Sequence, residues 1–234
     1  MQSVARQTLV EAAYHSVRTA IIDGHFTPGT KLVVRPLAEE LGLSPTPLKA
    51  ALAALEREGF VVSVPNRGYF VPRMGADDMR QIYELREVVD GIAARNAAHA
   101  EDRRGLVQAL GHLLQQQQLA VNQGDFGQYS DLDVLFHHAI WHSCGNPRLT
   151  RIAENLQGQL RIGSGTTAQV PGRIDEALSE HADILAALER SDPVAAEKHT
   201  RAHVRRAGEA LKRALVPAST HPGAVGLKPA GFEH

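Results

Sequence analysis

The sequence predicts a mainly α-helical protein with a small N-terminal domain and a larger, all-helical C-terminal bundle. Apolar residues recur at helical spacing through most of the chain, and a β-rich run, FVVSVPNRGYFVP, occurs only near residue 65. With 234 residues, 43 % of them hydrophobic, the chain can bury two cores. We expect the domains to cover residues 8–74 and 76–215. Residues 216–234, rich in Pro and Gly and without periodicity, are expected to be a disordered tail.

The N-terminal domain is predicted to begin with two helices joined by a turn. Residues 9–22 carry apolar side chains at helical spacing and are followed by Gly24, a helix stop signal. The stretch HFTPGTKL is typical of a turn. A second short helix is expected over 36–41, because it begins with proline and a glycine follows it.

The third helix has two prolines near its start, in the segment ELGLSPTPLKAALAAL. Ser44 is a suitable N-cap, which places Pro45 and Pro47 at the first and third helical positions. Backbone N–H groups there have no intrahelical acceptor, so the prolines help to start the helix. The leucines at i, i+4 and i+7 should face the other two helices; they are Leu48, Leu52 and Leu55.

A hairpin is predicted after the third helix, with its turn at residues 65–68. Three helices, a Gly-Leu-Ser turn and a hairpin together indicate a winged helix-turn-helix. Its third helix would enter a DNA major groove, and Arg67 at the hairpin tip would reach phosphate or the minor groove. A small α+β domain that contacts no nucleic acid is the alternative. The net charge of −1, with only a slight basic excess before residue 75, allows DNA binding without arguing for it.

The C-terminal part is predicted to be a helical bundle, since no strand pattern interrupts it. One cysteine, Cys144, excludes a disulfide framework and cysteine-based zinc motifs. No apolar run has the length of a membrane span and no leader is evident, so we expect a soluble, cytoplasmic protein. The expected helices are 76–100, 104–122, 126–143, 147–161, 173–189 and 193–215.

Histidines on core-facing helix stripes indicate chemistry in this bundle. Asp133 and His137 are four residues apart, which places a carboxylate and an imidazole on one helix face. His199 and His203 repeat this spacing, and His181 precedes apolar residues at inward positions. A carboxylate with two or three imidazoles suits a divalent transition metal, namely Zn²⁺, Ni²⁺, Mn²⁺ or Fe²⁺. Hydrogen-bonded core histidines are the alternative. His138 and His142 are expected on the solvated or boundary side of their helix.

The N-terminal residues resemble the DNA-binding domain of GntR-family transcription regulators. The resemblance covers residues 17–71, VRTAIIDGHFTPGTKLVVRPLAEELGLSPTPLKAALAALEREGFVVSVPNRGYFV. The segments YELREVVDGIAARNAA, DLDVLFHHAIWHSCGNPRL and SEHADILAALERSDPVAAEKHTRAHV resemble, in order, the helical effector domain of the FadR-like branch, the FCD domain. The resemblance implies a homodimer that binds a palindromic double-stranded DNA operator and releases it, or changes its grip, when a small ligand enters the bundle.

The resemblance also implies specific functional residues. It assigns the metal to Asp133, His137, His181 and His203, and makes His199 a neighbour.

It further places Arg86 toward an effector carboxylate, and a guanidinium beside a bound cation would suit a small organic acid. An ion pair of Arg86 with Glu84, Glu87 or Asp90 is the alternative. Fatty acyl ligands fit a small polar cavity less well.

The start of the third helix departs from the family pattern, which usually resembles SRTPVREAL. Pro45 and Lys49 stand where that pattern has arginines, and Ala50 replaces its glutamate. An arginine contact to guanine is worth about 1–3 kcal/mol of discrimination, so the operator should differ or the affinity should be weaker. The residues expected to contact DNA are Arg35, Ser44, Thr46, Lys49 and Arg67.

Two other classes of function are alternatives to a ligand-controlled regulator. A metal-dependent enzyme is disfavoured, because no histidine follows a Glu-x-x-His pattern and no hydrolase or phosphate-loop motif occurs. A metal sensor, in which the ion itself is the effector, remains open. We therefore expect a regulator without catalytic residues.

Overall fold

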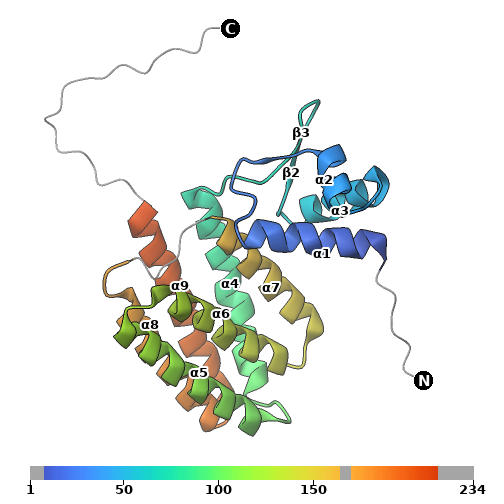
Figure 1. Ribbon diagram of the computed structural model, residues 1–234. Helices are drawn as coiled ribbons and strands as arrows, with labels where there is room; N and C mark the ends of the chain where they lie inside the picture. Colours follow the sequence, from blue (N-terminus) through green and yellow to red (C-terminus); the bar gives the residue numbers. More distant parts are fainter. Residues whose placement is uncertain (1–7, 164–169, 216–234) are drawn as a thin grey trace, which may run out of the picture.

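The protein is described by a computed structural model that covers residues 8–163 and 170–215. In these two ranges nine α-helices and three short strands follow one another, which confirms the mainly α-helical class. Figure 1 shows the small N-terminal domain, with its protruding hairpin, at one end of the helical bundle. The tail predicted for 216–234 lies outside the described residues.

The N-terminal domain contains three helices and a small antiparallel sheet with strand order β1-β3-β2. The helices are α1 (Leu9–Ile22), α2 (Val34–Glu40) and α3 (Pro45–Arg57), and the strands are β1 (Lys31–Leu32), β2 (Val62–Val64) and β3 (Gly68–Phe70). In the hairpin turn Asn66 and Gly68 both have positive φ, which Asn and Gly accept most readily.

Two sequence predictions for this domain were wrong in detail. Residues 31–32, expected in a turn, form strand β1, because Leu32 pairs with Tyr69 of β3 and its side chain is buried. Helix α2 begins at Val34, two residues before the expected start. A proline is tolerated within the first helical turn, so Pro36 does not mark the first position.

Helix α3 buries its leucines as expected. Leu48, Leu52 and Leu55 are all 0 % exposed and belong to a core that also contains residues of α1 and α2. Ser44 is the N-cap residue, but its side chain accepts no capping hydrogen bond. Pro47, at the N3 position, has no N–H to donate. The Ser44 hydroxyl therefore does not cap the N-terminus of α3.

The bundle contains six helices whose ends lie within three residues of those expected. They are α4 (Ala76–Ala97), α5 (Arg103–Gln123), α6 (Phe126–Ser143), α7 (Pro147–Ile162), α8 (Arg173–Glu189) and α9 (Pro193–Leu215). Their main core includes Phe136, Trp141, Ile184 and Leu188. Among the described helices, none combines the length and the apolar character required to cross a lipid bilayer.

Helix α7 connects the bundle to the N-terminal domain. Ile162 at its end packs into the N-terminal core, and Gly158 lets the Phe60 ring approach closely. A Cβ at Gly158 would lie 2.8 Å from the Phe60 ring, so a larger residue would force the ring or helix α7 to move.

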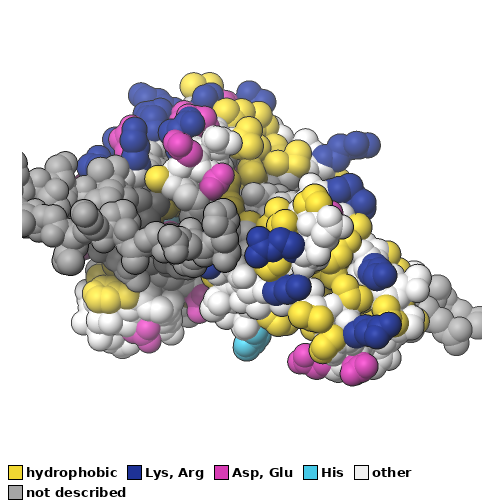
Figure 2. All heavy atoms as spheres, turned by 90° about the horizontal axis from the view of Figure 1, so that it is seen from above, with side chains coloured by type: hydrophobic (Ala, Val, Ile, Leu, Met, Phe, Trp, Pro, Cys, Tyr) yellow, Lys and Arg dark blue, Asp and Glu magenta, His cyan; other side chains and the backbone are white. Residues whose placement is uncertain are grey.

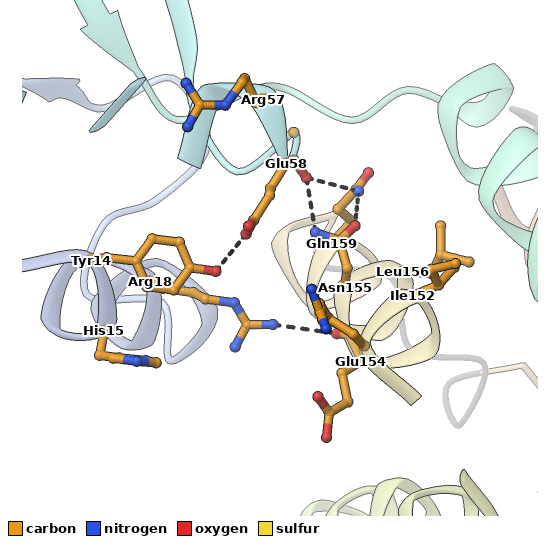
Figure 3. A pocket seen from close by; sticks show the side chains of 12 residues that line it. Tyr14, His15, Arg18, Arg57, Glu58, Ile152, Glu154, Asn155, Leu156 and Gln159 are labelled. Carbon is orange, nitrogen blue, oxygen red and sulfur yellow. Dashed lines mark hydrogen bonds between the residues drawn. The ribbon is translucent and has the colours of Figure 1, made fainter. Parts of the chain in front are cut away.

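Glu58, the C-cap of α3, is the polar centre of this junction (Figure 3). Its backbone carbonyl accepts hydrogen bonds from the side chains of Asn155 and Gln159 on α7. Its carboxylate accepts a hydrogen bond from the hydroxyl of Tyr14 on α1. Arg18 donates to the carbonyl of Glu154 at 3.4 Å. The end of the third helix is thus tied both to its own domain and to the bundle.

Candidate metal centre and DNA-binding surface

The five residues expected to contact DNA are all exposed. Arg35 lies on α2, Ser44, Thr46 and Lys49 lie at the start of α3, and Arg67 lies at the hairpin tip. Glu58, at the other end of α3, is the residue that is bonded to α7, so Ser44, Thr46 and Lys49 lie at the end of the helix remote from that contact. Figure 1 shows α2, α3 and the hairpin together on that side of the domain.

Lys31 is a further basic residue of this surface, which the sequence pattern does not indicate because HFTPGTKL has the composition of a turn. It is exposed on β1, and its Nζ lies 5.9 Å from the centre of the Phe70 ring. The guanidinium of Arg67 lies 5.8 Å from the same ring. Figure 2, which looks down on the molecule, shows Lys and Arg side chains spread over this domain.

Inside the bundle, three helices bring a carboxylate and three imidazoles together. Asp133 and His137 come from α6, His181 from α8 and His203 from α9. One ligand atom from each lies within 4.8 Å of all the others. The Nε2 atoms of His203 and His137 are 3.2 Å apart, and Nε2 of His181 is 3.5 Å from Oδ1 of Asp133. The three imidazoles are buried, whereas the Asp133 side chain is 31 % exposed.

His199 lies outside this group. Its side chain is 36 % exposed, and its Nδ1 lies 3.9 Å from a carboxylate oxygen of Asp183. His203, one turn further along α9, is buried instead. The four-residue spacing between His199 and His203 does not by itself show which of the two imidazoles faces the core.

Two neighbouring side chains orient the imidazoles. Oε1 of Gln117 lies 3.0 Å from Nδ1 of His181, and Oε2 of Glu180 lies 2.8 Å from Nδ1 of His203. Both oxygens accept, so each Nδ1 carries a proton and each ring is held in a fixed orientation. The Nε2 atoms of the two rings face the other members of the group, as in metal sites whose histidines donate to a carboxylate or amide outside the ligand set.

Burial and nearby charges set the ionisation states of the residues in and around this group. Burial, and then nearby positive charge, holds the pKa of His137 and of His181 well below the usual value, so both imidazoles are neutral at pH 7. Burial opposes ionisation of Glu180, but its hydrogen bonds with His203 and Arg173 lower its pKa to about 2. A neutral imidazole is the form that binds metal.

A cavity of about 30 Å³ adjoins the group. Two arginines line it. Arg86 of α4 donates to one carboxylate oxygen of Asp90, at 2.7 Å from Nη2 and 3.2 Å from Nε. The ion pair considered from sequence therefore exists, and Arg86 also lines the cavity.

Arg173 of α8 donates from Nη2 to Glu180 at 2.7 Å, while its buried Nε and Nη1 have no hydrogen-bond partner among the described residues. The hydroxyl-bearing side chains of Tyr83 and Tyr129 complete the polar lining.

The model of the bacterial regulatory proteins of the GntR family matches residues 9–71, and the FCD domain model matches residues 81–206. The chain belongs to the GntR family.

Its relatives are regulators. The HTH-type transcriptional regulator McbR of Escherichia coli is 30 % identical over 173 residues, 72 % of this chain and 77 % of McbR. A probable D-xylose utilization operon transcriptional repressor of Paenarthrobacter nicotinovorans is 27 % identical over 225 residues, 93 % of this chain and 92 % of that protein. The solved structure of E. coli McbR/YncC has the same fold, with a TM-score of 0.71, 24 % identity, and coverage of 88 % of this chain and 98 % of that one.

This GntR-family chain is thus a DNA-binding transcriptional regulator, as expected, and belongs to a family of regulators and not of enzymes. Sequence reasoning missed Gln117, Glu180 and Arg173 around its histidine group. Glu180 adjoins His181 in the sequence, which is a weak signal. Gln117 lies within a run of four glutamines, where nothing but the fold distinguishes one glutamine from the next.

Proposed function

We propose that this regulator binds a palindromic operator as a homodimer, and that a small organic acid controls the binding from a metal site in the bundle. The observation that carries the proposal is the buried Nε2 of His181, which has no hydrogen-bond partner among the described residues. An unpaired buried nitrogen is unfavourable by about 1–3 kcal/mol. Its place among three other ligand side chains is what a cation site requires.

The donor set fits a divalent transition metal. Asp133, His137, His181 and His203 would hold the ion, and three imidazoles with one carboxylate suit Zn²⁺, Ni²⁺, Mn²⁺ or Fe²⁺. When bound, the ion supplies a positive charge that attracts a carboxylate. The protein positions the ligands through Gln117 and Glu180 (see above).

The arginines favour an acid as the effector. Arg86 and Arg173 both line the cavity, and the buried Nε of Arg173 has no hydrogen-bond partner among the described residues, while its Nη1 lies 3.7 Å from a carboxylate oxygen of Glu176. Guanidinium groups bind carboxylates with paired hydrogen bonds. A cavity of about 30 Å³ holds one or two water molecules, so an acid must widen it, and this movement would give the ligand its effect.

The connections between the domains offer a route for that movement. Helix α4 carries Arg86 and follows the hairpin directly, and α7 bonds to Glu58 at the end of α3. A shift of either helix would change the orientation of α3. We infer that the ligand alters the spacing of the two third helices in a dimer, and so the fit to two half-sites.

The first experiment is selection of bound duplexes from a random pool by the purified protein at a stated salt concentration. Enrichment of an inverted repeat is expected and would supply a probe for screening acids. An acid that releases the probe from Zn²⁺-loaded protein should lose its effect in Arg173→Lys and on metal removal. Arg190→Lys is the matched control, since Arg190 is exposed at the end of α8. Acid release without metal would contradict the proposed site.

A metal sensor is the second candidate, favoured by the small volume of the cavity. In that case operator affinity should follow the free metal concentration with no acid present. If affinity instead stays constant while the metal is titrated, the ion is only a part of the effector site.

A further inference from the structure

A second group of metal-ligating side chains lies on the outside of the bundle. His138 and His142 occupy successive turns of α6, and Glu154 lies on α7. One ligand atom from each lies within 4.8 Å of the other two. Nε2 of His142 is 2.9 Å from Oε1 of Glu154, and their side chains are 61 % and 35 % exposed. His138 is half-buried beside them.

The composition of this group points to a transition metal. Two histidines at i and i+4 present their rings to one point, and a carboxylate from a neighbouring helix adds a third ligand. Two imidazoles and one carboxylate form a ligand set found in zinc sites, with a fourth position open to water. The exposure of His142 and Glu154 allows a hydrated ion to reach the group.

This group is distinct from the histidine group in the core. His137 and His138 are consecutive, so their side chains leave the helix about 100° apart and point to different surroundings. Trp141 lies between them, with ring-centre distances of 4.9 Å to His138 and 6.1 Å to His137. We propose that His138, His142 and Glu154 form a second divalent-metal site that fastens α6 to α7.

The second site lies on the turn of α7 that contacts the N-terminal domain. Glu154 is the residue whose backbone carbonyl accepts the hydrogen bond from Arg18 of the N-terminal domain. Figure 3 shows that Arg18 contacts this backbone carbonyl, whereas the Glu154 carboxylate extends to one side and takes no part in that bond. An ion on this side chain would therefore hold the α7 turn that contacts the DNA-binding domain without competing for that contact.

The test is a count of bound Zn²⁺ per chain, by equilibrium dialysis with Zn²⁺ alone and elemental analysis. Wild-type protein should bind two ions, and His142→Ala and Glu154→Gln should each bind one. Both changes are at the surface, so folding is expected to be retained, which circular dichroism can check. His112→Ala is the matched control, because His112 is exposed on α5 and belongs to neither group.

The experiment tests the core metal site and the second metal site independently of each other. His181→Ala should remove one ion and leave the other, which His142→Ala should then remove. Retention of the full wild-type count in both His142→Ala and Glu154→Gln would overturn the second site, whatever happens to the core site. Trp141 is the only tryptophan of the chain, so a Co²⁺ titration should quench its fluorescence in His181→Ala but not in His181→Ala/His142→Ala. Equal quenching in both proteins would also contradict the proposal.

Discussion

Replacing Gln117 by leucine tests whether the core group is built to hold a metal. The Gln117 side chain is fully buried, and its Oε1 accepts from Nδ1 of His181 at 3.0 Å. Loss of a partner that orients a ligand histidine typically lowers metal affinity about 10–100-fold, or about 1.4–2.7 kcal/mol. We expect a loss in that range for Zn²⁺ in Gln117→Leu.

The metal-free protein should change little in stability. The substitution leaves the Nδ1–H of His181 without an acceptor, which costs about 1–3 kcal/mol. It also removes the Gln117 Nε2, which is buried without a partner and carries a penalty of similar size. The two effects oppose each other, so the free energy of unfolding in EDTA should shift by less than about 1 kcal/mol.

Competition with a chelator of known Zn²⁺ affinity measures the metal affinity. Urea unfolding in EDTA measures the free energy of unfolding of the metal-free protein. Gln115→Leu provides the control, because Gln115 is exposed on the same helix. Unchanged Zn²⁺ affinity in Gln117→Leu would refute the orienting role. A large loss of stability without metal would show that the hydrogen bond serves the fold instead.

Three further outcomes follow from the N-terminal domain. Leu52→Ala should destabilise it by about 2–5 kcal/mol in urea unfolding, because Leu52 is 0 % exposed in the core; a smaller change would mean that the site collapses around the gap. Burial, and then the bond to Glu58, raise the pKa of Tyr14 to about 12, above its unfolded value of about 10. The buried, protonated Tyr14 hydroxyl therefore stabilises the folded state below pH 10, and this contribution is lost as the pH rises toward 12. Wild type should lose stability faster than Tyr14→Phe over that interval. Urea midpoints that fall in parallel for the two proteins would contradict this. Arg67→Ala should weaken binding to all duplexes and flatten its salt dependence, whereas Lys49→Ala should also change sequence preference; an equal loss on every duplex for Lys49→Ala would exclude base reading.

Much of the helical architecture could be predicted because it rests on local signals. Prolines and glycines mark the helix ends, and apolar spacing marks the buried faces of α3 and of the bundle helices. Strand β1 could not be predicted, because two residues are too few to show an alternation of polar and apolar side chains. Only the pairing of Leu32 with Tyr69 makes this segment a strand. The start of α2 was missed because a proline is compatible with more than one position in the first turn.

The sequence by itself determined the class of the protein, the helices that carry its histidines, and which side chains are chemically able to bind a metal. These follow from residue type and from spacing along one helix. Residue spacing left both His199 and His203 as candidate ligands, and the family resemblance selected His203. Only the tertiary structure decided that Gln117 reaches His181 and that Arg173 lines the cavity beside the histidine group. These contacts join helices far apart in the chain, so they depend on how α5, α6, α8 and α9 pack, which no local pattern encodes.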